Sequence, residues 1–204
     1  MCIEKSIKFC FYPFPPYAFF GKSKVNLTEF LLQPGNVLLN VGQMWYRYNT
    51  KRWIMHILFI CTANIIRSFM AETIFREKLR RNGRKDISVS SAALIDMKGA
   101  AADPIAARIV LENGLDGTAH RSRLLTGEAL SGADLIVVME KRHRDLIVRD
   151  YPEGEPKIRL LKSYLKGYNE TDGDIRDPRG LSVYHYRLCF SEIYLAVEAM
   201  LGAF

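Results

Sequence analysis

The chain has 204 residues, of which 29 are Lys or Arg and 22 are Asp or Glu, so its formal net charge at pH 7 is +7. Hydrophobic residues make up 49% and charged residues 25%, a composition that excludes a disordered chain, a collagen and a disulfide-stapled miniprotein. No uncharged apolar run reaches about 18 residues, which excludes a helical membrane protein.

The first 54 residues differ from the rest of the chain. They hold seven Lys and Arg against two Asp and Glu, a net charge of +5, which leaves 22 against 20, or +2, for the other 150 residues. The basic charge therefore belongs mainly to this segment, and we expect no nucleic-acid partner. Phe9–Phe20 combines aromatic residues with three prolines and shows no helical or strand period.

We therefore predict an N-terminal extension over residues 1–54 and one domain over residues 55–204. Three interpretations of the extension stay open. It is an appendage that packs on the domain, a poorly ordered tail, or the product of a start set upstream of the true one at Met44 or Met55. It is not a signal peptide, because it lacks an uninterrupted apolar stretch and a cleavage site.

The remaining sequence alternates strands with helices. A buried strand is predicted at Ile57–Cys61, followed by a loop and by a helix at Phe69–Arg81 with Ser68 as its N-cap. Asp103-Pro104 combines an N-cap residue with a proline at the first helical position and predicts the start of another helix. The other predicted elements are strands at Ile87–Ser91, Ala133–Met139 and Ile158–Leu161, and helices at Thr126–Leu130, Glu140–Asp150 and Ser182–Leu201.

This alternation predicts an α/β fold with a parallel sheet covered on both faces. Such sheets bind ligands beyond the carboxyl ends of their strands, which directs attention to the loop after the first strand. The charged segment Glu140–Arg144 is predicted to be a solvated helix face with one Glu–Arg pair, and His143 has no predicted partner.

The cysteines indicate a reduced protein. No two of them form a CxxC pair, and no histidine cluster at metal-ligand spacing accompanies them. We therefore expect a cytoplasmic protein without a metal or a cofactor. The four cysteines are Cys2, Cys10, Cys61 and Cys189, and the last is predicted to be a buried core thiol.

The loop after the first strand has the pattern Cys61-x5-Arg67-Ser68. The backbone N–H groups of a short loop that leads into a helix form a cradle for an anion. An arginine at the far end of the loop binds phosphate oxygens bidentately. A cysteine beneath the anion is favoured as a thiolate and can attack the bound phosphorus, and the Ser68 hydroxyl can hydrogen-bond that thiolate.

A leaving alkoxide or phenolate also needs a proton. One carboxyl group can give this proton and later take one from water. Asp177, in the loop Gly173–Gly180, is the predicted general acid, because the following proline stiffens the chain and sets the direction of the side chain. Asp172 and Asp174 are weaker candidates.

Four segments, in this order and spacing, resemble the low-molecular-weight protein tyrosine phosphatase family. They are CTANIIRS at Cys61–Ser68, Ser91-Ala92, HRSR at His120–Arg123, and Asp177-Pro178. The resemblance covers residues 55–204. It implies a three-layer α/β sandwich with a four-stranded parallel sheet and helices on both faces, and a hydrolase without a cofactor.

The resemblance also implies roles for single residues. Cys61 is the nucleophile, Arg67 the phosphate clamp and Asp177 the general acid, while Ser91 and His120 support the loop. The implied partners are phosphotyrosine-containing proteins and a cognate tyrosine kinase, with no membrane, and the implied assembly is a monomer or a weak dimer. The residues implied to bind the substrate are Thr62, Ala63, Asn64, Ile65, Ile66 and Ser68.

This sequence departs from the family pattern at several positions. Ala63 replaces a glycine and would cost about 1 kcal/mol if the position needs a positive φ. Ile66 replaces a second cysteine, so an oxidised Cys61 would lack its disulfide partner. Phe69 replaces a proline, and Arg179 stands where many members have an aromatic residue. Arg179 either favours acidic residues beside the phosphotyrosine or is simply solvated.

Within the family an aliphatic residue at Ile65 goes with phosphotyrosine and a threonine with phosphoarginine. We therefore expect a protein tyrosine phosphatase. The alternatives are a phosphoarginine phosphatase, an arsenate reductase of the same fold, and a catalytically weak phosphate-binding module. A further alternative is that the basic residues 1–54 recruit acidic partners.

Overall fold

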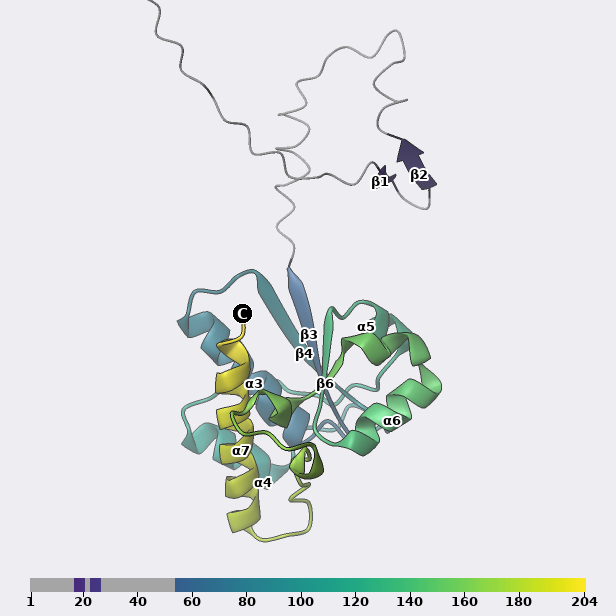
Figure 1. The fold of residues 1–204 in the computed structure, drawn as a ribbon. Coiled ribbons are helices and arrows are strands. Elements are labelled where there is room, and N and C mark those ends of the chain that lie inside the picture. Colours follow the sequence, from purple (N-terminus) through teal and green to yellow (C-terminus); the bar gives the residue numbers. More distant parts are fainter. Residues whose placement is uncertain (1–16, 21–22, 27–53) are drawn as a thin grey trace, which may run out of the picture. The chain divides into compact units, whose positions relative to one another are not determined.

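The computed structural model describes residues 17–20, 23–26 and 54–204 (Figure 1). The chain divides into two units, residues 1–51 and residues 52–204. In the first unit β1 (Tyr17–Phe20) and β2 (Ser23–Asn26) form an antiparallel hairpin. β1 lies at the end of Phe9–Phe20, a segment in which the sequence shows no strand period. The rest of the predicted extension lies outside the described residues, so its nature stays a prediction.

The second unit contains one four-stranded parallel sheet. Its strand order is β4-β3-β5-β6, so the chain leaves β3 first toward one side and later toward the other. The carboxyl end of β3 is therefore the point at which the strand order reverses, where sheets of this kind bind ligands. The strands are β3 (Met55–Cys61), β4 (Ile87–Ala93), β5 (Leu135–Val138) and β6 (Ile158–Leu160).

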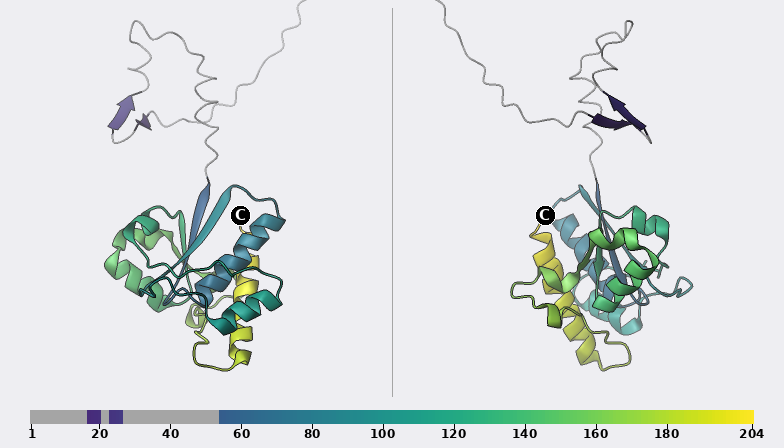
Figure 2. Two further views of the ribbon diagram at one scale, coloured as in Figure 1. Left: turned by 180° about the vertical axis from the view of Figure 1, so that it is seen from behind. Right: turned by 45° about the vertical axis from the view of Figure 1, so that its right-hand side comes forward.

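Helices cover both faces of this sheet (Figures 1 and 2). On one face lie α3 (Arg67–Arg81), α4 (Pro104–Glu112) and α7 (Val183–Leu201), and on the other α5 (Gly127–Ser131) and α6 (Lys141–Asp150). Three 3₁₀ helices follow β5, at Pro152–Lys157 (η1), Leu161–Tyr164 (η2) and Glu170–Asp172 (η3). The predicted three-layer sandwich is confirmed.

The alternation of side chains along β3 separates two hydrophobic cores. Ile57, Phe59 and Cys61 point into the core beneath α3, α4 and α7, whereas Leu58 and Ile60 point into the core beneath α5 and α6. All five side chains are at most 3% exposed, as expected for a strand in the middle of a doubly covered sheet. The central strand is thereby held on both faces, and its carboxyl end is fixed in place.

Of the two helix N-caps predicted from the sequence, Asp103 and Ser68, the structure confirms the first and contradicts the second. Asp103 caps α4, because its Oδ1 accepts the backbone N–H groups of Ile105 and Ala106. The prediction that Ser68 caps the next helix of the chain after β3 is wrong. That helix, α3, begins at Arg67, and Ile66 occupies the N-cap position without a side-chain hydrogen bond. Ser68 lies inside the first turn, which leaves its hydroxyl available to the loop.

Cys189 on α7 is a core thiol, as predicted. It is 4% exposed, and burial raises its pKa to about 12. A thiol held so firmly in its protonated form is a poor nucleophile.

Candidate active site

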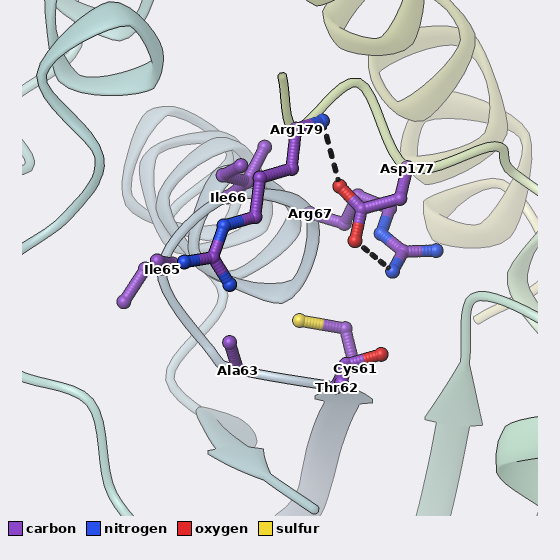
Figure 3. A pocket seen from close by; sticks show the side chains of 8 residues that line it. All are labelled: Cys61, Thr62, Ala63, Ile65, Ile66, Arg67, Asp177 and Arg179. Atoms are coloured by element: carbon purple, nitrogen blue, oxygen red, sulfur yellow. Dashed lines mark hydrogen bonds and ion pairs between the residues drawn. The ribbon is translucent and has the colours of Figure 1, made fainter. Parts of the chain in front are cut away.

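One pocket opens at the carboxyl end of β3 (Figure 3). It brings together the predicted nucleophile, phosphate clamp and general acid, although the last is more than a hundred residues away in the sequence. Ser91 and His120 do not line it but contact the loop from outside. The residues that line the pocket are Cys61, Thr62, Ala63, Ile65, Ile66, Arg67, Asp177 and Arg179.

The loop between β3 and α3 turns at Asn64, not at Ala63. Asn64 has a φ of 54°, and Ala63 is not among the described residues with a positive φ. Asparagine tolerates the left-handed conformation better than alanine because its side chain can hydrogen-bond locally. The backbone strain considered for Ala63 is therefore absent, and the residue with a positive φ in this loop is Asn64.

The Sγ atom of Cys61 receives two hydrogen-bond contacts. The backbone N–H of Asn64 donates to it over 3.3 Å, and the Oγ of Ser68 lies 3.0 Å away. The direction of the second bond follows from its neighbours. Asn64 Nδ2 donates to Ser68 Oγ over 2.8 Å, so the Ser68 proton is left to point at the sulfur. The sulfur therefore accepts hydrogen bonds from two donors of its own loop.

A buried carboxylate ends this chain of hydrogen bonds. The second proton of Asn64 Nδ2 goes to Ser91 Oγ at 2.7 Å, and Ser91 in turn donates to Glu72 Oε2. The Nδ2 group of Asn64 can only donate, so both serine hydroxyls accept from it, and their own protons point to the Cys61 sulfur and to Glu72. The residues Asn64, Ser68, Ser91 and Glu72 are all at most 2% exposed, so no solvent competes for these bonds.

His120 fastens the same turn from the other side. Its Nε2 lies 2.6 Å from the carbonyl oxygen of Asn64, and because a carbonyl only accepts, Nε2 carries the proton. Its Nδ1 faces Glu72 at 3.9 Å. Burial lowers the pKa of His120 below its usual value. A neutral imidazole that donates a hydrogen bond to the loop backbone is consistent with the predicted role of His120 as a support of the loop.

Arg67 is buried beneath the pocket, with its side chain 1% exposed. Nη1 donates to Glu140 Oε1 at 2.5 Å and to the carbonyl of Ile175 at 3.0 Å, and Nη2 donates to Asp177 Oδ2 at 2.6 Å. Burial opposes its charge, but the nearby Cys61, Asp177 and Glu140 raise the pKa of the guanidinium. Its Nε is buried and has no hydrogen-bond partner among the described residues.

Glu140 corrects the prediction of a solvated face at Glu140–Arg144. The residue lies two positions after the end of β5 and is 9% exposed, with its carboxylate between Arg67 and Arg142. Burial acts to raise its pKa, but the charge and hydrogen bond of Arg67 bring the pKa below the usual value. Glu140 therefore stays ionised and holds the arginine in its orientation.

His143 is also buried, contrary to a solvated helix face. Its Nε2 lies 3.0 Å from Thr62 Oγ1 and 3.3 Å from Glu140 Oε2, so it joins the loop after β3 to the start of α6. Burial, assisted by the charge of Arg67, lowers the pKa of His143 to about 4. It is therefore neutral at pH 7 and packs beside the arginine without repelling it.

Asp177 reaches the pocket from the loop before α7. Its Oδ1 accepts the backbone N–H of Arg179 at 3.0 Å, while Oδ2 faces Arg67 (Figure 3). The loop is anchored to the sheet edge, because the backbone N–H of Ile175 donates to the carbonyl of Met139 at 2.8 Å and Asp174 accepts the backbone N–H of Lys141. Asp174 is thus occupied as an anchor, whereas Asp177 faces the pocket.

Sequence reasoning missed Glu72, Glu140 and His143. Two signals were available. Glu72 follows Ser68 by four residues and so shares its face of α3. Glu140 lies two positions after a buried strand, at the edge of the sheet where ligands bind. His143 carries no comparable signal.

A sequence profile of the low molecular weight phosphotyrosine protein phosphatase family matches residues 56–204. The chain belongs to this family. Like the other low molecular weight phosphatases, it is a protein phosphatase and hence a hydrolase. The match spans every residue of the pocket and all of the sheet except Met55, so the predicted family is confirmed.

Relatives of this phosphatase carry two kinds of name. The protein-arginine-phosphatase of Geobacillus stearothermophilus is 33% identical over 144 residues, which cover 71% of this chain and 92% of the relative. The low molecular weight protein-tyrosine phosphatase A of Mycobacterium tuberculosis is 32% identical over 149 residues, 72% of this chain and 87% of the relative. The names alone do not decide between the two substrates.

Solved structures of low molecular weight phosphatases share the fold. The protein tyrosine phosphatase of T. tengcongensis superimposes with a TM-score of 0.68 at 34% identity, covering 74% of this chain and 99% of that protein. The YwlE arginine phosphatase of Geobacillus stearothermophilus gives a TM-score of 0.66 at 31% identity, covering 73% and 92%. In the described part of this phosphatase no helix is long and apolar enough to cross a bilayer.

Proposed function

We propose that residues 55–204 form a phosphatase domain that hydrolyses phosphotyrosine in proteins through a phosphocysteine intermediate. Cys61 is the nucleophile, Arg67 the phosphate clamp and Asp177 the general acid and base. The observation that carries this proposal is the unpaired Nε–H of Arg67, a buried donor that shares the pocket with Cys61. Leaving such a donor unsatisfied costs about 1–3 kcal/mol, and a phosphate oxygen supplies the missing acceptor.

The loop after β3 forms the rest of the phosphate site in this proposal. The first N–H groups of α3 have no partners within the helix, and the helix dipole at this end favours a negative charge. The apolar side chains of Ile65 and Ile66 form walls above the loop. Ser91 and His120 act through the loop and touch no substrate. The loop residues that line the pocket and bind the phosphate group in this proposal are Thr62, Ala63, Ile65 and Ile66. Asn64 and Ser68, which the sequence predicts in the same role, do not line the pocket and contact the Cys61 sulfur instead.

In the first step the Cys61 thiolate attacks the phosphorus, and the bond between phosphorus and the tyrosine oxygen breaks. The arriving phosphate dianion takes Arg67 Nη2 from Asp177, and repulsion between the two anions favours a proton on the Asp177 carboxyl. That proton passes to the leaving phenolate. The products of this step are a phosphocysteine, a free tyrosine hydroxyl and an Asp177 carboxylate.

In the second step Asp177 takes a proton from water, and the oxygen of that water attacks the phosphocysteine. The bond between sulfur and phosphorus breaks, which releases inorganic phosphate and restores the thiolate. Ser68 donates a hydrogen bond to the leaving sulfur. A related structure supports a covalent intermediate, since a cysteine-to-serine mutant of the YwlE arginine phosphatase carries a phosphorylated active site serine.

Phosphotyrosine is preferred to phosphoarginine because of the pocket walls. Among the described residues that line the pocket, Asp177 is the only carboxylate, and Ile65 offers no hydroxyl to a guanidinium. Apolar side chains suit a flat phenyl ring, whereas the exposed Arg179 repels a cation. Among the relatives, the Wzb protein of Vibrio vulnificus has been solved in complex with benzylphosphonate, an aromatic phosphonate. A tyrosine kinase would supply such substrates.

Hydrolysis of para-nitrophenyl phosphate at pH 5–6 in the presence of EDTA tests the chemistry. Turnover should vanish in Cys61→Ser and fall about 10²–10⁴-fold in Asp177→Asn. Acid quenching during turnover should trap a phosphate adduct, and mass spectrometry should locate it on Cys61.

A chain that starts at Met55 should hydrolyse para-nitrophenyl phosphate as fast as the full chain. Activity that survives in Cys61→Ser contradicts the mechanism, and a folded protein that binds vanadate without turnover is the phosphate-binding module.

Peptides that differ only in phosphotyrosine or phosphoarginine test the substrate. The wild type should show the higher kcat/KM for phosphotyrosine, and Ile65→Thr should shift the ratio toward phosphoarginine. A higher kcat/KM of the wild type for the phosphoarginine peptide would replace the proposed substrate by the alternative.

A further inference from the structure

Arg179 lies on a rigid turn at the mouth of the pocket. The backbone N–H of Leu181 donates to the carbonyl of Pro178 at 2.9 Å, and Gly180 within this turn has a φ of 77°. A turn of this kind needs glycine at the position of positive φ. Since the backbone N–H of Arg179 also donates to Asp177, the general acid and the arginine are held together.

The Arg179 side chain spans the pocket. Figure 3 shows it reaching from the loop of Asp177 toward Ile65 on the opposite side, with its guanidinium above the space into which the Cys61 sulfur points. A peptide whose phosphorylated side chain enters the pocket must therefore pass its neighbouring residues close to this guanidinium. The side chain is exposed, so it meets such residues without first breaking internal contacts.

The charge of Arg179 is unneutralised, unlike that of other arginines near the site. Arg67 and Arg142 pair with Glu140, and Arg123 faces Glu72 at 3.5 Å. The Arg179 guanidinium makes no ion pair or hydrogen bond with any described residue. A fixed cation without a carboxylate partner is an acceptor site for an anionic group of the substrate.

We propose that Arg179 determines specificity by binding a carboxylate side chain next to the phosphotyrosine of the substrate protein. This inference rests on the proposed function. The planar guanidinium matches a carboxylate bidentately, and the rigid turn limits the conformational entropy lost on binding. An exposed ion pair contributes up to about 1 kcal/mol, so a substrate with the carboxylate should have a kcat/KM about five times that of a substrate without it. This gain should decrease as salt is added.

Three phosphotyrosine peptides of equal length test the proposal, with alanine, glutamate or lysine beside the phosphotyrosine. The measured quantity is the ratio of kcat/KM between the glutamate and alanine peptides within each variant, so that any general change in catalysis cancels. The full-length wild type should show a ratio of about five, falling toward one at 0.5 M NaCl. Arg179→Ala should give a ratio near one, and Arg179→Glu should prefer the lysine peptide.

Arg176→Ala is the matched control. Arg176 is an exposed arginine of the same loop that makes no ion pair with a described residue, but it does not line the pocket. It should keep the wild-type ratio. A wild-type ratio near one, an unchanged ratio in Arg179→Ala, or an equal loss in Arg176→Ala overturns the proposal.

Turnover of para-nitrophenyl phosphate separates failure of this inference from failure of the proposed function. Turnover that depends on Cys61, together with a ratio near one, overturns the role of Arg179 alone. Absence of such turnover overturns the proposed function, and the role of Arg179 with it.

Discussion

Replacing Glu140 by alanine should destabilise the protein and weaken the hold on Arg67, the residue that we propose as the phosphate clamp. Glu140 Oε1 lies 2.5 Å from Arg67 Nη1, and the two side chains are 11% and 1% exposed. Removing one partner of a buried ion pair costs about 3–5 kcal/mol, because the other charge stays buried. Asp177 and the carbonyl of Ile175 still face the guanidinium, so we expect a loss of about 2–3 kcal/mol in the free energy of unfolding.

The same substitution should slow catalysis. A guanidinium that has lost its carboxylate on Nη1 keeps only the carbonyl of Ile175 and Asp177 as partners and is held less firmly, and a misplacement of about 1 Å in an active site costs about 10²-fold in rate. We expect kcat/KM for para-nitrophenyl phosphate to fall about 10–100-fold in Glu140→Ala. Glu140→Gln should lose less in both measurements, because the amide oxygen still accepts a hydrogen bond from Arg67.

Urea unfolding and steady-state kinetics measure these two effects. Asp145→Ala is the control, because Asp145 lies on the same helix α6 but is 68% exposed and faces Arg144 at 3.4 Å. It should change the free energy of unfolding by less than about 1 kcal/mol and leave kcat/KM as in the wild type. If Glu140→Ala behaves like Asp145→Ala in both assays, the assigned role of Glu140 is refuted.

Three further predictions concern the surroundings of the loop. Since the pKa of His143 is lowered to about 4 in the folded protein, its contribution to stability is complete above the unfolded pKa of about 6.5 and is lost as the pH falls. Urea unfolding should show a loss of about 2 kcal/mol between pH 7 and pH 5, and His143→Gln should lose clearly less. Ser91→Ala leaves Asn64 and Glu72 each short of a buried partner and should lower the free energy of unfolding by about 1–3 kcal/mol, whereas an unchanged value would show that water replaces the hydroxyl. Ala63→Gly should lower stability by about 0.5–1 kcal/mol without raising kcat, because Ala63 does not have a positive φ, and a gain in either would mean that the alanine is strained.

The strands and helices around the sheet could be predicted because the residues within each element indicate its type. The β-branched and apolar run at Ile57–Cys61 is a strand, and Asp103-Pro104 starts a helix. These patterns act within a few residues of the chain, so tertiary contacts do not change the structure that they predict. The predicted cap at Ser68 is wrong because α3 begins one residue earlier, and the Ser68 hydroxyl bonds instead to Asn64 and Cys61 of the preceding loop.

The site was predictable only in part, for a related reason. Cys61 and Arg67 lie within one short loop, and their spacing is visible in the sequence. Glu140 is charged and begins a helix rich in charged residues, which is typical of a solvated face. Only the fold places it against Arg67, and the burial of that arginine makes a carboxylate necessary. The burial of such a polar residue depends on the partner that it meets in the fold, and its neighbours along the chain do not reveal that partner.

Arg67 also has a mechanical consequence for the loop that carries Asp177. This loop has no regular helix or strand after η3, and Arg67 fastens it at two points, the carbonyl of Ile175 and the Asp177 carboxylate. The side chain that we propose as the phosphate clamp therefore also holds the loop that carries the proposed general acid. In that proposal, a phosphate that binds Arg67 Nη2 breaks the hydrogen bond to Asp177 and leaves the carbonyl of Ile175 as the remaining contact between Arg67 and the loop. Binding of phosphate would then free the Asp177 carboxyl and loosen its loop through the same exchange of hydrogen bonds.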